Sequence, residues 1–209
     1  MPGLVRRTKR IASVLPAGLA KEGLIMNDEQ QVVADVRVWL EKAVIGLNLC
    51  PFAKSVHVKN QIRYVVSKAA NLEMALEELL LELRHLRETS PEETDTTLLV
   101  FPDMFSDFYV FNDVLELVDQ ITDAEEFNDA FQVVSFHPRF QFANTRLDDI
   151  ENYTNRAPYP IWHLIREASI DRAVQSFPDA EAIYGRNIQT LRELGLAGWQ
   201  QLFTQHPEK

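Results

Sequence analysis

The sequence contains a single cysteine, Cys50, among 209 residues. One chain therefore cannot form an internal disulfide bond, and it cannot bind zinc through four cysteines. Proteins of a reducing compartment commonly have few cysteines and no disulfide bonds, so we expect a cytoplasmic protein.

Glycine and lysine are missing from long central stretches, and each gap argues against a class of cofactor. No glycine lies between Gly46 and Gly185, so no predicted strand is followed by a glycine-rich loop of the kind that binds nucleotide phosphates. No lysine lies between Lys68 and Lys209, and the earlier lysines lie in no motif for a Schiff base with pyridoxal phosphate. We therefore expect no cofactor.

Charge is distributed unevenly along the chain. Residues 1–25 contain five Lys or Arg and one acid, whereas the rest contains 16 Lys or Arg and 30 Asp or Glu. So acidic a body repels phosphate backbones, which argues against nucleic-acid binding. No stretch approaches the roughly 20 apolar residues of a membrane-spanning helix, so we expect no membrane partner. The sequence does not indicate an oligomeric state.

The first 25 residues are expected to lie outside the folded domain. A basic segment followed by an apolar one has the outline of a signal peptide, but the apolar run is short and is broken by Pro16. Met26 begins a helix-capping sequence and is an alternative start. We predict a flexible extension or a misplaced start over residues 1–25, and a single α/β domain over residues 26–209.

Hydrophobic periodicity predicts strands that alternate with helices. We expect helices over residues 28–47, 71–88, 105–121, near 160–174 and over 179–204, and strands over 62–66, 96–101 and 131–136. Long connections between the strands favour parallel pairing, and residues 140–143 offer a short antiparallel strand. The prediction is an α/β fold with a small, mainly parallel or mixed sheet of about three to four strands, packed by helices, with extra helices at the C-terminus.

Two predicted strands end in proline next to charged or titratable residues: Pro102 precedes Asp103, and Pro138 lies between His137 and Arg139. Proline interrupts the hydrogen bonding of a sheet, and ligands of open α/β sheets bind beyond the carboxyl ends of parallel strands. We predict that these side chains face one crevice, with His137 as a general acid or base because imidazole titrates near neutrality. The alternative is that His137 only caps the strand.

Four arginines lie close together after the third strand. The segment "NRAPYPIWHLIRE", residues 155–167, reads as a helix entered through two prolines, which places His163 and Arg166 on one face. Guanidinium groups match carboxylate or phosphate oxygens, whereas pairing with nearby acids such as Asp148 would only stabilise the loop. The predicted substrate-binding residues are Asp103, Arg139, Arg146, Arg156, His163 and Arg166.

Cys50 is a candidate nucleophile in the segment "GLNLCPFAK". If Pro51 begins a short helix, the helix N-terminus favours a thiolate at Cys50; if Cys50 ends the preceding helix, the helix dipole opposes ionisation. A third alternative is a buried, unreactive thiol. The histidines lack the spacing of a metal site, and one assembled in space from Cys50, His137 and His163 has only a weak signal, so we predict no metal.

Three segments together, "GLNLCPFA", "FHPRFQF" and "NRAPYPIWHLIRE", resemble an uncharacterised bacterial family, domain of unknown function 1415. The resemblance extends from about residue 28 to residue 204. It implies a bacterial, cytoplasmic, stand-alone domain, and it carries no activity and no catalytic residues.

We expect an enzyme or a binding protein for a small anionic metabolite, with a pocket of His and Arg side chains and participation of Cys50. This hypothesis requires Cys50, His137, Arg156 and His163 to surround one concave pocket. The alternative is a non-catalytic protein–protein interaction domain that uses its acidic surface or its aromatic cluster, the nine phenylalanines between Phe101 and Phe142. The sequence indicates neither the reaction nor the substrate.

Overall fold

The structure is a computed structural model that describes residues 28–176 and 182–204. The predictions for residues 1–25 and for a start at Met26 lie outside the described residues. None of the described helices has the length and apolar content needed to cross a bilayer.

A four-stranded mixed sheet forms the centre of the fold. Its spatial order is β1, β2, β4, β3, with bounds β1 Ile62–Val66, β2 Thr96–Val100, β3 Phe131–Phe136 and β4 Ile161–Arg166. β1 pairs with β2 in parallel, and β4 runs antiparallel to both of its neighbours. The predicted α/β fold and the mixed form of the sheet are therefore confirmed.

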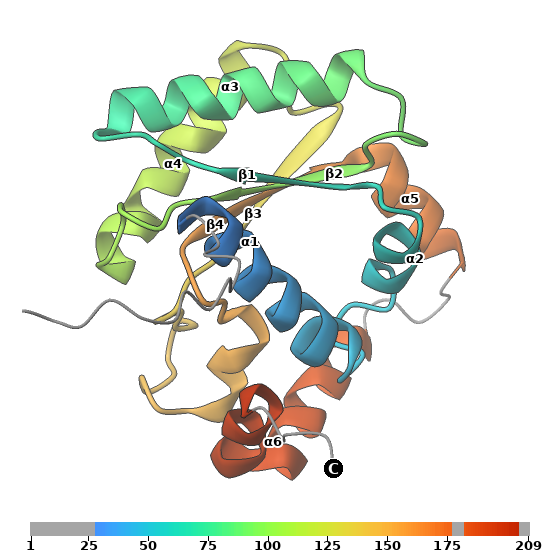
Figure 1. The fold of residues 1–209 in the computed structure, drawn as a ribbon, viewed down its shortest axis with the longest axis vertical. Helices are drawn as coiled ribbons and strands as arrows, with labels where there is room; N and C mark the ends of the chain where they lie inside the picture. Colours follow the sequence, from blue (N-terminus) through green and yellow to red (C-terminus); the bar gives the residue numbers. More distant parts are fainter. Residues whose placement is uncertain (1–27, 177–181, 205–209) are drawn as a thin grey trace, which may run out of the picture.

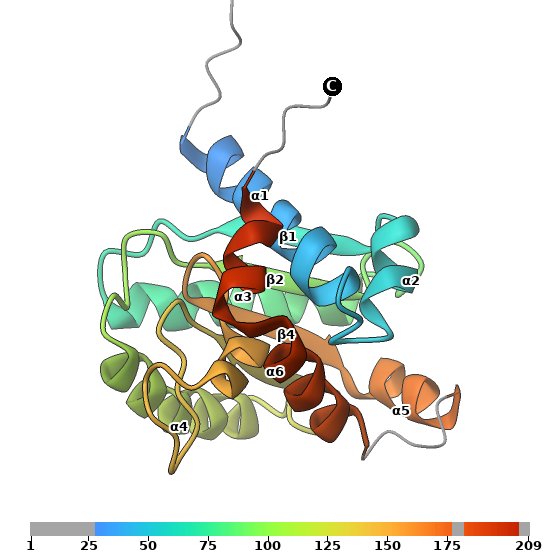
Figure 2. The same ribbon diagram turned by 90° about the horizontal axis from the view of Figure 1, so that it is seen from below.

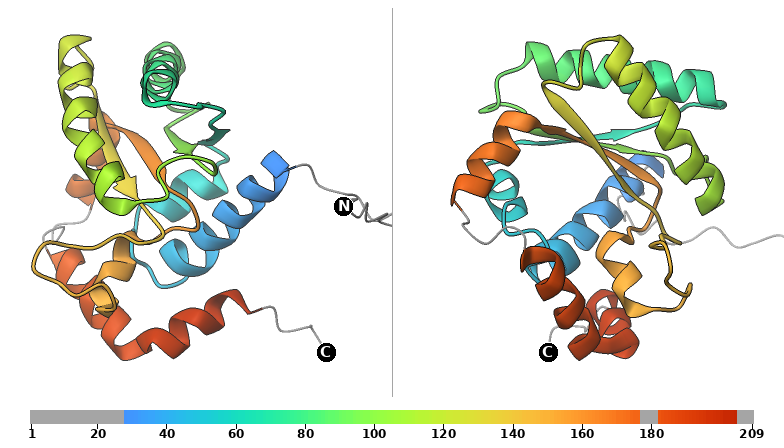
Figure 3. Two further views of the ribbon diagram at one scale, coloured as in Figure 1. Left: turned by 90° about the vertical axis from the view of Figure 1, so that its left-hand side faces the viewer. Right: turned by 180° about the vertical axis from the view of Figure 1, so that it is seen from behind.

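Helices cover both faces of this sheet (Figure 1, Figure 2). One face carries α3 (Leu72–Glu88) and α4 (Phe108–Ala124); the other carries α1 (Asp28–Trp39), the π-helical segment η1 (Leu40–Ile45) and α6 (Ala182–Phe203). The short helix α2 (Ala53–Val58) and α5 (Glu167–Ser176) lie near one another at one end of the sheet in Figures 1 and 3, and η2 (Ile150–Asn155) contacts α6.

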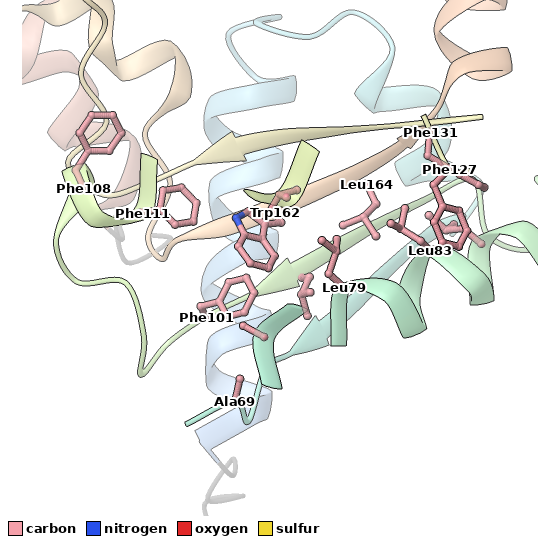
Figure 4. Close-up of a cluster of buried hydrophobic side chains, with 14 residues drawn as sticks. Ala69, Leu79, Leu83, Phe101, Phe108, Phe111, Phe127, Phe131, Trp162 and Leu164 are labelled. Atoms are coloured by element: carbon pink, nitrogen blue, oxygen red, sulfur yellow. The ribbon is translucent and has the colours of Figure 1, made fainter. Parts of the chain in front are cut away.

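The side chains between the sheet and α3 and α4 form what we call the first core (Figure 4). Leu79 and Leu83 of α3 face Trp162 and Leu164 of β4, and all four side chains are fully buried. Phe101 stacks edge-on against Trp162, with ring centroids 4.6 Å apart. The aromatic residues concentrated after residue 100 therefore serve largely as core, since interiors of this kind are close-packed.

The opposite face of the sheet packs on what we call the second core. Val36 of α1, Ala43 of η1 and Leu191 of α6 meet Leu98 and Ile161 of the sheet there. The alternation of side chains along a strand sends neighbouring residues of β2 and β4 to different cores.

The predicted helix near residues 160–174 is wrong in its first half, which forms strand β4. Ile161, Trp162 and Leu164 are fully buried, so the segment needs apolar partners on both faces, as a central strand has and an amphipathic surface helix lacks. Pro160 ends an extended entry, and its carbonyl accepts a hydrogen bond from Phe101 N at 2.9 Å. The short strand expected over residues 140–143 does not form.

Helix boundaries elsewhere follow local signals. Asn71 caps α3 by accepting from Met74 N, and Asp107 caps α4 by accepting from Tyr109 N and Val110 N. The long helix expected over residues 28–47 exists, but its last part is the π-helix η1.

The π-helix depends on a glycine at its end. Gly46 N donates to Glu41 O at 3.0 Å, a bond across five residues that widens the helix. This geometry brings the Lys42 carbonyl oxygen within 2.3 Å of the place that a Cβ at Gly46 would occupy. A side chain at position 46 therefore cannot be accommodated unless the backbone of η1 moves.

We predict that Gly46→Ala lowers the free energy of unfolding by about 1–3 kcal/mol, the usual cost of forcing an extra methyl into a packed site. Gly185→Ala is the matched control: position 185 is exposed in α6, and a Cβ there meets nothing within 4 Å. That variant should be unchanged or more stable by up to about 1 kcal/mol. Urea unfolding of both variants measures this, and equal effects would contradict the role assigned to Gly46.

Candidate ligand-binding pocket

A cavity of about 870 Å³ lies on the second-core face of the sheet, bordered by η1, α2 and α5. Its volume is in the range of small-molecule sites. Near the amino ends of β1 and β2, Gln61, Ile62, Asp95 and Thr96 line it. The carboxyl ends of β2 and β3 lie at the same end of the sheet, as expected. The pocket, however, lies toward the opposite end, where β1 and β2 begin.

Apolar side chains from the sheet and from three helical segments make up most of the wall. Leu98, Val134 and Phe136 line it from the sheet, and Leu40 and Val44 line it from η1. The π-helix thus contributes directly to the shape of the pocket. A wall of this kind suits a ligand with an apolar body.

His163 lies in the middle of β4 and supplies a polar atom within this apolar wall. Its Nε2 is 2.8 Å from the Thr96 hydroxyl, which itself donates to the Leu164 carbonyl at 2.6 Å. A hydroxyl has one proton to give, so His163 Nε2 must be the donor and Nδ1 carries a lone pair. Burial lowers the pKa of His163 to about 4, so the ring is neutral at pH 7.

Cys50 lines the same pocket, between η1 and α2. The helix after it begins at Ala53, so neither helical arrangement expected for the thiol is realised in full. Burial raises the pKa of the Cys50 thiol, and the backbone N–H groups of Phe52 and Ala53, which favour a thiolate, offset this only in part. The thiol is therefore protonated at neutral pH.

Four charged residues line the pocket near the amino ends of β1 and β2, and we call this end the mouth because three of the four are exposed. Asp95 Oδ1 accepts from Ser169 Oγ at 2.6 Å and lies 3.5 Å from Arg172 Nη2. Glu92 accepts hydrogen bonds from its own backbone N–H and from Ser90, which lower its pKa.

Lys59, at the end of α2, is the fourth charged residue. Within residues 28–176 and 182–204, nothing pairs with its ammonium group. Its charge is therefore available to a ligand at the mouth of the pocket.

His137 lies elsewhere, among the aromatic rings of the first core. It is 1% exposed, its Nε2 lies 2.8 Å from the Phe105 carbonyl, and its Nδ1 accepts from Arg139 N at 2.9 Å. Both ring nitrogens are thus engaged with backbone, and burial lowers the pKa of the ring. His137 links the loops after β2 and β3; a catalytic role stays a prediction, which these bonds do not favour.

Arg166 points away from the pocket, because it lies three residues beyond His163 in a strand and so on the opposite face. Its Nη2 donates to the carbonyls of Leu86, Thr89 and Thr94 at 2.5, 2.7 and 3.0 Å. The placement of His163 and Arg166 on one helical face is therefore wrong. Arg166 joins the end of α3 to the segment before β2.

The other predicted anion-binding residues also lie outside the pocket wall. Arg156 donates to the carbonyls of Phe140 and Leu147 and lies 4.1 Å above the ring of Tyr153. It holds its loop by backbone contacts rather than by the acidic partners considered above. The remaining three predicted substrate-binding residues, Asp103, Arg139 and Arg146, are exposed to solvent.

Of the four residues expected around one pocket, the structure brings together Cys50 and His163 and leaves out His137 and Arg156. Sequence reasoning missed Thr96 and Lys59. Thr96 carried no signal, because its role depends on its register against β4. Within the described parts of the chain, no three His, Cys, Asp or Glu side chains gather in a way that could hold a metal ion.

We predict that alkylation of Cys50 by iodoacetamide is slow at pH 7–8 and rises with a midpoint above the free-thiol value of about 8.5. The raised thiol pKa has this sign, since the reactive thiolate forms only at higher pH. Cys50 is the sole cysteine, so mass spectrometry reads it directly. The protein unfolded in urea is the control; a folded-state midpoint below that of the unfolded protein would restore the nucleophile hypothesis.

We predict that Arg166→Gln lowers the free energy of unfolding by about 1–3 kcal/mol, because backbone carbonyls at the end of α3 lose their donor. Arg146→Gln is the control, since the Arg146 side chain is exposed and lies 3.8 Å from an exposed Asp148 carboxylate. Urea melts compare the two variants. If Arg166→Gln were as stable as Arg146→Gln, the carbonyl contacts would not contribute to stability.

Comparison with known proteins assigns the chain to a family but gives no activity. No curated protein and no solved structure matches the chain. A family model matches residues 31–201, a range that contains β1 to β4 and every residue of the pocket wall named above. The chain belongs to the family described as "Protein of unknown function (DUF1415)".

Proposed function

We propose that this protein binds a small molecule with an apolar body and one anionic group in the pocket between η1, α2, α5 and the sheet. The observation that carries the proposal is a cavity of about 870 Å³ with a mainly apolar wall and, at its mouth, the cation Lys59, which pairs with none of the described residues. A large apolar pocket with a few convergent polar groups is the usual form of a ligand site.

The charges at the mouth support an anionic group rather than a cationic one. Asp95 is occupied by Ser169 and Arg172, and Glu92 by hydrogen bonds from its own backbone and from Ser90. Lys59 is the charged group at the mouth for which the described residues supply no partner. An acid on the ligand would remain near solvent there, which avoids the cost of burying a charge.

Binding is better supported than catalysis. A nucleophilic cysteine needs a lowered thiol pKa, whereas burial raises that of Cys50. A general base works best with a pKa near the operating pH, whereas that of His163 is about 4. The anion site of four arginines expected from the sequence finds no support, because two of these arginines bind backbone carbonyls.

We also propose a bacterial, cytoplasmic protein. The family resemblance supports the first part, and the single cysteine supports a reducing compartment. The alternative of a protein–protein interaction domain with an acidic surface stays a prediction.

We predict that the protein binds 2-naphthoate more tightly than the neutral 2-naphthamide, and that Lys59→Gln removes this preference. The expected loss of naphthoate affinity is about two- to fivefold, as for an exposed ion pair. Lys54→Gln is the matched control, because Lys54 is an exposed cation of the same helix that does not line the pocket. Fluorescence titration measures both affinities.

A pair of blocking variants locates the binding. Ala173→Trp fills the pocket from α5 and should abolish binding, whereas Val174→Trp, at an exposed position outside the wall, should not. If neither naphthalene compound binds at millimolar concentration, or if Ala173→Trp binds as well as Val174→Trp, the proposal fails.

A further inference from the structure

His163 has one hydrogen-bonding atom that the protein leaves without a partner. Nε2 donates to Thr96, and Nδ1 accepts from no residue in the described part of the chain. Five buried side-chain atoms elsewhere are both unpartnered and sealed from solvent; Nδ1 of His163 is not one of them. Since His163 lines the pocket, its lone pair is accessible from there.

The surroundings of this lone pair are apolar. In the register of the sheet, His163 lies between Leu98 on β2 and Val134 on β3, and both side chains also line the pocket. The ring of Phe136 lies beside it, with centroids 6.1 Å apart. A ligand that covers this acceptor without donating a hydrogen bond to it leaves the lone pair buried and unsatisfied, and therefore binds more weakly.

The direction of the hydrogen bond is determined by Thr96. Because the Thr96 hydroxyl gives its proton to the Leu164 carbonyl, the proton of the imidazole stays on Nε2. Nδ1 can therefore only accept. A ligand carbonyl or carboxylate would meet a lone pair there, whereas a hydroxyl or an N–H group would find its partner.

Resting on the proposed function, we infer that the ligand is an apolar acid with a second polar end: a neutral hydroxyl or N–H group that donates to His163 Nδ1, while the acid lies toward Lys59. The two polar sites thus select opposite ends of one molecule. His163 rejects analogues that lack the donor, because a site built to form a hydrogen bond discriminates strongly against a ligand that cannot form it.

Three naphthoates of one shape test this inference. 6-Hydroxy-2-naphthoate can donate to His163, 6-methoxy-2-naphthoate can only accept, and unsubstituted 2-naphthoate separates the bulk of the methyl group from the loss of the donor. We expect the wild-type protein to bind the hydroxy compound about tenfold more tightly than either of the others, the factor that one net hydrogen bond supplies. His163→Phe should lower affinity for the hydroxy compound alone and so abolish the preference.

Thr96→Val keeps the test decisive if His163→Phe does not fold, as thermal melting would show. Without the threonine hydroxyl, the imidazole proton is free to move to Nδ1, and the preference must fall. A preference that survives intact in the folded variant, or is absent from the wild type, overturns the inference.

The two proposals fail in distinguishable ways. If no naphthoate binds, the proposed function itself is refuted. If all three bind equally and Ala173→Trp removes binding, the pocket is a ligand site and only the donor requirement is refuted.

Discussion

The hydrogen bonds of β4 to β2 on one side and to β3 on the other hold the sheet together, and the rest of the structure depends on them. Without β4, the parallel pair β1–β2 and the strand β3 would be separate elements. Its buried side chains need apolar partners on both faces, and these come from α3 and α4 on one face and from α1, η1 and α6 on the other. Two cores thus meet at one strand.

The side chains of β4 alternate between the first core and the pocket. Trp162 and Leu164 point into the first core, Arg166 binds the carbonyls at the end of α3, and His163 points into the pocket. The protonation of His163 follows from its burial and from its hydrogen bond to Thr96. This is why the ring of His163 is neutral and its Nδ1 can accept a hydrogen bond.

The pocket exists because the second-core face is not filled along its whole length. The π-helix ends at Gly46, where the chain can turn toward Cys50 and α2 without a clash of a side chain with the Lys42 carbonyl. α2 lies near α5 at one end of the sheet, and the pocket lies between them. Lys59, the C-cap residue of that short helix, lies at the mouth.

Local patterns in the sequence determined much of the fold. The strands β1 and β3 have the bounds that their β-branched and aromatic runs predict, and α3 begins one residue after the expected position because Asn71 caps it. The family, too, was evident from three short segments. These features depend on neighbours within a few residues, which is the range over which propensity and capping act.

Tertiary structure alone decided the identity of β4 and, through it, the site. The segment from Ile161 to Arg166 shows neither a helical nor a strand period of apolar residues, because a strand buried on both faces is apolar at most positions. A polar residue such as His163 occurs there only because a neighbouring strand supplies a hydrogen-bond partner, here Thr96. The sequence also predicted an anion site at Arg156 and Arg166. Their partners are instead the carbonyls of Phe140 and Leu86, which lie 16 and 80 residues away in the sequence. Which backbone carbonyl lacks a donor, and which side chain can reach it, is set only when the elements pack.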